Sequence, residues 1–276
     1  MIATQQYGWT QHAARDGLSW PEAMGWAMRQ AASAGFSAWE PVLFSPEEAT
    51  LVGDLAREHG LAMPSIFLTG MLHEAGSAEA TQDRFQKTAA IAARYGCRHA
   101  MVYPSTLPGQ AAKSDLELAQ QAKQLTRLAR SLRPLGIQLC YHPEDPEMHR
   151  AANEFHHMML ATDPADVALC LDPDTVWRAA GQSNLAVMDC LSLYGNRTAA
   201  LHLRQMQNGI WAEALGPGDL DYPAILTTLV GKNVRPVLII EIALEDDTSV
   251  TLAPQEAHRL SLEYVRQHLL PIFGRT

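Results

Sequence analysis

The sequence predicts an α/β fold, a (β/α)8 TIM barrel made by a single domain over residues 1–276. Eight short apolar runs rich in β-forming residues alternate with segments of helical spacing along the whole chain. The length of 276 residues is near the roughly 250 residues typical of this barrel. An open doubly wound sheet is the alternative, but its glycine-rich nucleotide signatures are missing from the sequence.

The eight expected strands are apolar on both faces, with no regular alternation of polar residues. Strands of this kind are covered by helices and belong to a parallel sheet. In chain order they are 2–6, 38–43, 62–68, 99–103, 137–142, 167–172, 199–203 and 237–243.

The expected helices lie between these strands, and several of their ends carry clear signals. Gly35, Gly60, Gly96 and Gly136 each stand just before a strand, as helix-stopping glycines do, and Pro21 suits a first helical turn. The helices are 21–34, 46–59, 82–95, 114–132, 151–160, 185–194, 223–229 and 254–269.

Composition excludes several classes of function. The chain has 21 Lys+Arg against 30 Asp+Glu, a formal charge of −9, which argues against a nucleic-acid partner. Its 4 cysteines include no CxxC pair, so neither a disulfide scaffold nor a thiolate zinc site is indicated, and a cytoplasmic location is expected. We expect no signal peptide and no membrane association, because no cationic leader or long apolar stretch is present.

Acids and imidazoles gather at the ends of the last four expected strands, where a TIM barrel carries its active site. Carboxylate oxygens and neutral imidazole suit Mn, Mg, Co, Fe or Zn, and one such ion would offset the repulsion between buried acids. Each residue alone also has a structural interpretation, as a helix-start acid, a core histidine or a salt-bridge partner. The four candidate ligands are Glu147, Asp172, His202 and Glu241.

Four segments carry a resemblance to a known family. They are YHPEDPE at 141–147, LCLDPDTVWRAAG at 169–181, the stretch 201–226 with His-Leu-Arg and LGPGDLDYP, and LIIEIALE at 238–245. These segments resemble the strand ends of the xylose isomerase-like TIM barrels, the sugar-phosphate isomerase/epimerase superfamily that includes inosose dehydratase and endonuclease IV. The resemblance covers nearly the whole chain.

The resemblance implies one divalent metal ion held by the same four ligands. Glu147 is preferred as the strand-five ligand because it matches the acid that ends the motif of the Tyr-His branch, in which a second histidine often stands at the position of Glu144. Glu144 is the alternative ligand and is also a candidate for binding substrate. Cys140 stands where other branches take their first carboxylate, and Gln205 stands where an acid is frequent. Glu40 is expected to be a hydrogen-bonding acid behind the ligands.

The implied activity is that of a sugar, sugar phosphate or polyol isomerase or epimerase. Glu147 and Glu241 would move a proton at a carbon next to a carbonyl, through an enediolate. An inosose-type dehydratase would use the same site, and a catalytically idle sugar-binding barrel is the alternative from a different class. The acidic charge disfavours an endonuclease IV-like activity.

Further residues at the strand ends are candidates for binding the sugar. His142 and Arg204 can donate hydrogen bonds to hydroxyls or to an anionic group. Trp9, Phe67 and Tyr103 are candidates for an apolar wall against a sugar face. Barrels of this type often pair, which is compatible with a homodimer or a homotetramer.

Overall fold

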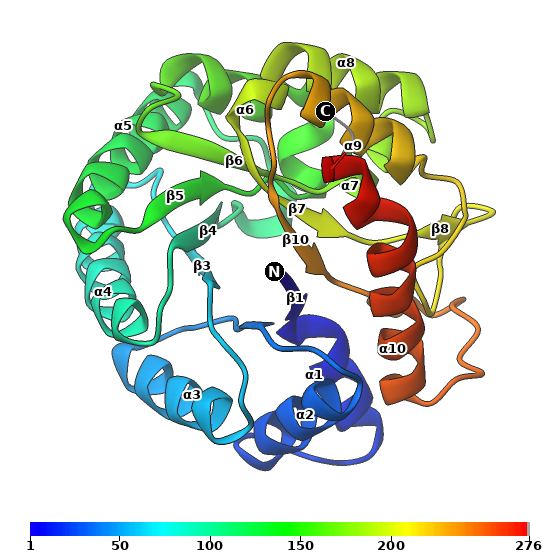
Figure 1. Ribbon diagram of the computed structural model, residues 1–276. Coiled ribbons are helices and arrows are strands. Elements are labelled where there is room, and N and C mark those ends of the chain that lie inside the picture. Colours follow the sequence, from blue (N-terminus) through cyan, green and yellow to red (C-terminus); the bar gives the residue numbers. More distant parts are fainter. Residues whose placement is uncertain (275–276) are drawn as a thin grey trace.

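The computed structural model describes residues 1–274 and contains a barrel of eight parallel strands enclosed by helices (Figure 1). The predicted TIM barrel is therefore confirmed. The strands follow the order β2-β1-β10-β7-β6-β5-β4-β3 around the ring. They are β1 (Ile2–Gln5), β2 (Trp39–Glu40), β3 (Ser65–Gly70), β4 (His99–Pro104), β5 (Gln138–Tyr141), β6 (Val167–Leu171), β7 (Thr198–Leu203) and β10 (Val237–Ile240).

The ring closes between β2 and β3 through isolated bridges in place of a continuous ladder. Ala38 pairs with Ala62, and Val42 pairs with Phe67, both in the parallel sense. The amide of Phe67 also donates to the carbonyl of Pro41 at 2.8 Å. These contacts complete the barrel at its least regular position.

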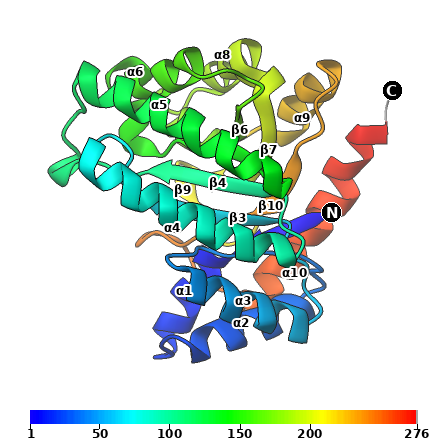
Figure 2. The same ribbon diagram turned by 90° about the vertical axis from the view of Figure 1, so that its left-hand side faces the viewer.

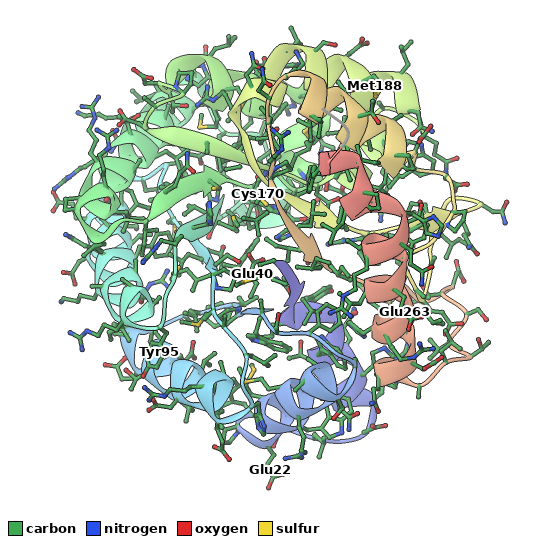
Figure 3. The ribbon with its side chains drawn as sticks, viewed as in Figure 1. Glu22, Glu40, Tyr95, Cys170, Met188 and Glu263 are labelled. Carbon is green, nitrogen blue, oxygen red and sulfur yellow. The ribbon has the colours of Figure 1, made fainter. Side chains whose placement is uncertain are left out.

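The helices form the outer layer, and Figure 2 shows α4 and α5 side by side over the neighbouring strands. Figure 3 shows Glu40 and Cys170 inside the ring of strands, whereas Glu22, Tyr95, Met188 and Glu263 lie around the outside. The helices are α1 (Gln6–Arg15), α2 (Glu22–Ser33), α3 (Pro46–Glu58), α4 (Ala75–Arg94), α5 (Asp115–Leu132), α6 (Asp145–Ala161), α7 (Pro173–Ala179), α8 (Asn184–Tyr194), α9 (Tyr222–Gly231) and α10 (Pro254–Tyr264).

Every predicted helix is present, and besides short 3-10 turns the described residues 1–274 contain two helices and two strands that were not predicted. Two are the short helices α1 and α7, which begin directly at strand ends. The other two form an antiparallel hairpin of β8 (Met206–Gln207) and β9 (Ile210–Trp211). The hairpin follows β7 and reaches the same end of the barrel as the predicted site residues.

Helix α6 is broken inside its sequence range. Residues 150–152 have φ between 53° and 58°, in the left-handed region, although none of them is glycine. The predicted start of this helix at residue 151 falls in the break. The preceding turn, which contains Glu144 and Glu147, therefore forms a separate short helical segment.

Two apolar layers stabilise the barrel. The outer layer fills the space between strands and helices and holds most of the large buried side chains. The interior of the ring is lined mainly by small residues, among them Ala3, Ala168, Cys170 and Ala200. No helix within residues 1–274 is both long and apolar enough to span a membrane.

Candidate active site

His202 is the central side chain of the site and is held on both ring nitrogens. It lies at the end of β7 with no exposed surface, and its Nε2 is 2.8 Å from Glu40 Oε1. Its Nδ1 lies 2.6 Å from Glu241 Oε2 and 3.1 Å from His142 Nε2. Glu40 therefore fixes the ring orientation and directs Nδ1 at Glu241, as carboxylate partners of metal-binding histidines do.

The charges of this group are strongly coupled. Burial alone would lower the pKa of His202, but Cys170, Glu40 and Glu241 raise this pKa well above its ordinary value. Burial alone would raise the pKa of Glu241, but Arg204 and His202 hold it well below its usual range. Without a bound cation the two side chains form an imidazolium–carboxylate pair, and a metal ion would displace the imidazole proton.

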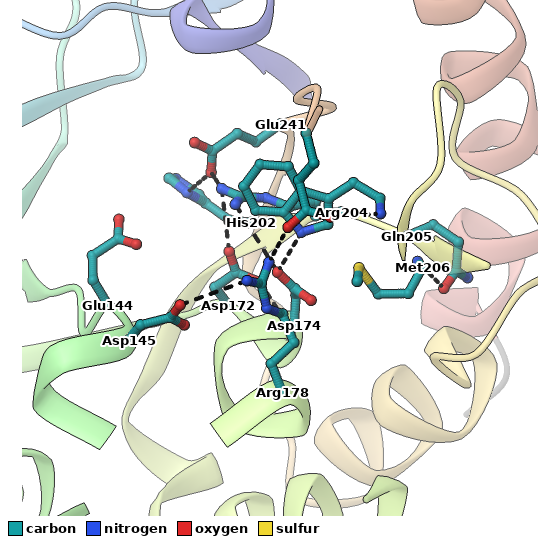
Figure 4. A network of polar contacts seen from close by, with 12 residues as sticks. Glu144, Asp145, Asp172, Asp174, Arg178, His202, Arg204, Gln205, Met206 and Glu241 are labelled. Atoms are coloured by element: carbon teal, nitrogen blue, oxygen red, sulfur yellow. Dashed lines mark hydrogen bonds and ion pairs between the residues drawn. The ribbon is translucent and has the colours of Figure 1, made fainter. Parts of the chain in front are cut away.

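Arg204 reaches into the same group from the end of β7. Its Nη2 lies 3.0 Å from Glu241 Oε2 and 3.5 Å from Asp172 Oδ2. The guanidinium stacks on the ring of Trp211, 4.4 Å from the ring centroid. Figure 4 shows this guanidinium among the carboxylates, so Arg204 and a metal ion would compete for the same oxygens.

Asp172 and Asp174 lie at the start of α7. Asp172 Oδ1 accepts from the amide of Asp174 at 3.0 Å, which caps the helix and leaves the buried Oδ2 without a hydrogen-bond donor. Burial raises the pKa of Asp172 to about 6 and that of Asp174 to about 7. Trp211 Nε1 donates to Asp174 Oδ2 at 2.9 Å, which ties the hairpin to this helix.

The structure separates Glu144 and Glu147, the two candidates after strand five. Glu144 faces the site, and its Oε1 is 3.6 Å from His142 Nδ1. Glu147 turns the other way, because its Oε2 accepts from the amide of Glu144 at 2.9 Å and its Oε1 lies 4.0 Å from Lys113 Nζ. Burial raises the pKa of Glu144 to about 7 and that of Glu147 to about 8.

Of the four predicted ligands, Asp172 and Glu241 lie together, His202 contacts Glu241, and Glu147 points away from them. The group that does form includes His142, which was predicted to bind substrate. Burial lowers the pKa of His142 well below its ordinary value, so its imidazole is neutral and retains a lone pair for a ligand.

The predicted aromatic wall is dispersed over three places. Phe67 lies within the barrel, with its ring centroid 5.2 Å from that of His142. Tyr103 lines the pocket beside Glu144. Trp9 is fully buried in the outer layer and stacks on His258 at 3.6 Å, because α1 carries it away from the strand end.

A pocket of about 310 Å³ opens at the carboxyl ends of β4 to β7. Trp211 lines it and was given no role from the sequence; its position between the His-Leu-Arg and LGPGD motifs was the available signal. The lining residues are Tyr103, Thr106, Gln110, Glu144, Asp145, Pro146, Asp174, Thr175, Arg178, Arg204 and Trp211.

The donor atoms beside this pocket fit a divalent cation. One atom each from His142, Asp172 and Glu241 lie within 4.8 Å of one another. His142 Nδ1 and Asp172 Oδ2 are buried and lack a hydrogen-bond partner, and Glu241 Oε2 is paired with His202 and Arg204. One imidazole and two carboxylates suit Mn, Fe, Co or Zn, and carboxylates also suit Mg. Cys170 forms a second group with His142 and His202, deeper in the barrel.

The fold and this pocket define a TIM barrel with an acidic, imidazole-containing site at the carboxyl ends of its strands. The model of the xylose isomerase-like TIM barrel family matches residues 28–268. The chain belongs to this family. A search of curated proteins found no match.

Solved structures with the same fold extend over nearly the whole chain. A sugar phosphate isomerase/epimerase from Parabacteroides distasonis ATCC 8503 has a TM-score of 0.73 and 18% identity, over 99% of this chain and 94% of its own. D-allulose 3-epimerase from Methylomonas sp. has a TM-score of 0.74 and 16% identity, over 97% of each chain. A xylose isomerase-like TIM barrel protein from Mycobacterium smegmatis in complex with magnesium has a TM-score of 0.71 and 14% identity, over 91% of this chain and 90% of its own.

Proposed function

We propose that this protein is a divalent-metal-dependent sugar isomerase or epimerase. The observation that carries the proposal is the convergence of His142, Asp172 and Glu241, whose donor atoms lie within 4.8 Å of one another beside a pocket. The similarity to a D-allulose 3-epimerase and to a magnesium-bound barrel supports the same class.

Asp172, Glu241 and an imidazole would hold the ion. His202, the ligand expected from the sequence, has its Nδ1 beside Glu241, and His142 forms the donor group with the two acids. A carboxylate after strand five would join them. We assign that fourth place to Glu144 in preference to Glu147. The reason is that Glu144 faces His142 across 3.6 Å, whereas Glu147 is engaged with the amide of Glu144 and with Lys113. A bound divalent ion would polarise the substrate oxygens and stabilise developing negative charge.

Glu241 and Glu144 are the proposed proton carriers. Glu241 follows β10 and Glu144 caps α6 after β5, so their carboxylates approach the pocket from different sides (Figure 4). Without a cation, Arg204 and His202 hold Glu241 ionised and therefore able to accept a proton, and the raised pKa of Glu144, about 7, suits a group that carries a proton at neutral pH. Removal of the proton by one and its return by the other gives isomerisation or epimerisation through an enediolate.

Two alternatives share this pocket. Loss of a β-hydroxyl in place of reprotonation would make the protein an inosose-type dehydratase. A catalytically idle sugar-binding barrel is favoured by one observation, the guanidinium of Arg204 that lies 3.0 Å from Glu241 Oε2, where a cation would bind.

Metal analysis and turnover test the proposal together. Protein stripped with a chelator should be inactive, and loading with Mn, Mg, Co, Fe or Zn should restore turnover of a ketose such as D-allulose or D-fructose. Product analysis separates epimer, aldose and dehydrated product, and inososes in the same panel probe the dehydratase reaction. Protein that binds no divalent ion and turns over none of these compounds would rule the proposal out.

A further inference from the structure

Both guanidinium groups that border the pocket are already paired with carboxylates. Arg178 Nη1 lies 2.7 Å from Glu245 Oε1, and its Nη2 lies 3.7 Å from Asp145 Oδ2. Arg204 is paired with Glu241 and Asp172, with only 7% of its side chain exposed. A phosphate group in this pocket would have to displace these carboxylates from their arginines.

Carboxylates outnumber cations around the pocket. Glu144, Asp145 and Asp174 line it, and Asp172, Glu241 and Glu245 are the partners of its two arginines. A bound divalent ion would compensate only part of this negative charge. A sugar phosphate would therefore enter against repulsion, and such like-charge contacts cost several kcal/mol.

The other polar side chains of the lining are uncharged. Tyr103, Thr106, Gln110 and Thr175 offer hydroxyl and amide groups, and the ring of Trp211 forms one wall. Hydroxyls and amides donate and accept hydrogen bonds, as sugar hydroxyls do. The volume of about 310 Å³ lies at the small end of the range of ligand pockets, about 300–1,000 Å³.

The glycine-containing loop 215–221 is filled by the protein itself. Gln205 Nε2 donates to the carbonyl of Gly216 at 2.8 Å and to that of Leu220 at 3.1 Å. A Cβ on Gly218 would lie 2.4 Å from the carbonyl oxygen of Met206. The space that glycine leaves here is occupied by the chain and offers no cradle for phosphate.

The small cavity that adjoins the pocket provides no cation to the pocket either. Lys113 is buried there and donates to Glu154 Oε1 at 2.6 Å, with Glu147 at 4.0 Å. Arg150 also borders this cavity, but it is exposed and is not among the residues that line the main pocket.

We infer that the substrate is an uncharged polyhydroxy carbonyl compound, an unphosphorylated ketose, and that the pocket discriminates against sugar phosphates. This inference rests on the proposed function and narrows its substrate class. The carboxylates that hold Arg178 and Arg204 are the source of the discrimination.

The test compares each ketose with its own phosphate on the metal-loaded protein, for example D-fructose with D-fructose 6-phosphate. We expect kcat/KM to be at least about 100-fold higher for the neutral sugar. In Glu245→Gln, which loses one carboxylate charge and keeps an oxygen for Arg178, the ratio should fall by about tenfold. Glu79→Gln, an equal charge change at an exposed residue of α4, should leave the ratio unchanged.

The possible outcomes separate this inference from the proposed function. A phosphate that is turned over as well as or better than the neutral sugar overturns the inference and leaves the isomerase or epimerase assignment intact. If neither compound is turned over, the isomerase or epimerase assignment fails. Calorimetry of the binding of the sugar and of its phosphate then tests whether the pocket discriminates against the phosphate. Tighter binding of the phosphate, or no binding of the neutral sugar, overturns the inference.

Discussion

Glu144 and Glu147 are three positions apart and have different partners, so they should respond differently to the same substitution. Glu144→Gln removes a proposed proton carrier and should lower kcat by about 10²–10⁴-fold. Glu147→Gln should keep kcat within about tenfold, because the amide oxygen of glutamine can still accept from the amide of residue 144. Steady-state kinetics of both variants check this. A Glu147→Gln protein that folds and is as inactive as Glu144→Gln would restore Glu147 as the ligand.

Glu241 is the second proton carrier and an expected ligand. Glu241→Gln should reduce turnover by about 10²–10⁴-fold while the circular dichroism spectrum stays that of the parent protein. Metal content of the variant, measured in parallel, shows how much of the loss is due to ligation. Unchanged turnover would refute the assignment, and Glu79→Gln is the matched control.

At the scale of residues, the sequence alone predicts the positions of side chains that lie at the end of a strand. Asp172 and Glu241 directly follow buried strands and His202 is the last residue but one of β7, so the barrel geometry alone brings them to one end. The position of Glu147 depends on how α6 begins and on a buried lysine from a distant segment, which no local pattern reports. The position of Trp211 depends on a short hairpin, whose two-residue strands are too short to show a periodic pattern in the sequence.

At the scale of elements, the buried Lys113 connects the segment before α5 to both parts of α6. Lys113→Met would leave Glu147 and Glu154 in a buried site without their cation. Loss of one partner of a buried pair typically costs about 3–5 kcal/mol, so we expect a decrease of that size in the free energy of unfolding. Urea denaturation measures it. Lys123→Met, at an exposed position of α5, should change the free energy by less than about 0.5 kcal/mol.

The predicted strands and long helices are present because buried runs and helical periodicity are strong local signals. Their ends differ in places: the strand expected at 38–43 is β2, Trp39–Glu40, and the helix expected at 82–95 begins at Ala75. Helices α1 and α7 were missed since they begin where a strand ends, and their first residues were assigned to strand-end loops. For the same reason Trp9 was placed in the pocket, although one turn of α1 moves it into the outer layer.

At the scale of the whole molecule, the buried acids make stability depend on pH. The pKa values of Asp172, Glu144 and Glu147 are raised to about 6, 7 and 8. The folded protein therefore holds protons that the unfolded chain has released, and the free energy of unfolding should fall as pH rises from about 5 to 8. The raised pKa of His202 acts in the same direction, because its contribution is lost as pH rises through the folded pKa.

Urea denaturation at pH 5.5 and pH 8, with chelator present, should show a decrease of at least about 1 kcal/mol. Glu147→Gln removes one of the acids with a raised pKa and should therefore reduce the dependence of the free energy of unfolding on pH. A free energy of unfolding that increases over this interval would contradict the pKa shifts.

The irregular closure between β2 and β3 has a consequence for the time course of amide exchange. With few hydrogen bonds across that seam, local opening there costs less free energy than opening of β6 or β7, and the amides within residues 38–43 should take up deuterium before those of β6 and β7. Glu40 belongs to this segment and holds Nε2 of His202. Each opening of the seam would free the imidazole from its partner, so deuterium uptake at residues 38–43 would report how often the reactive group loses its alignment.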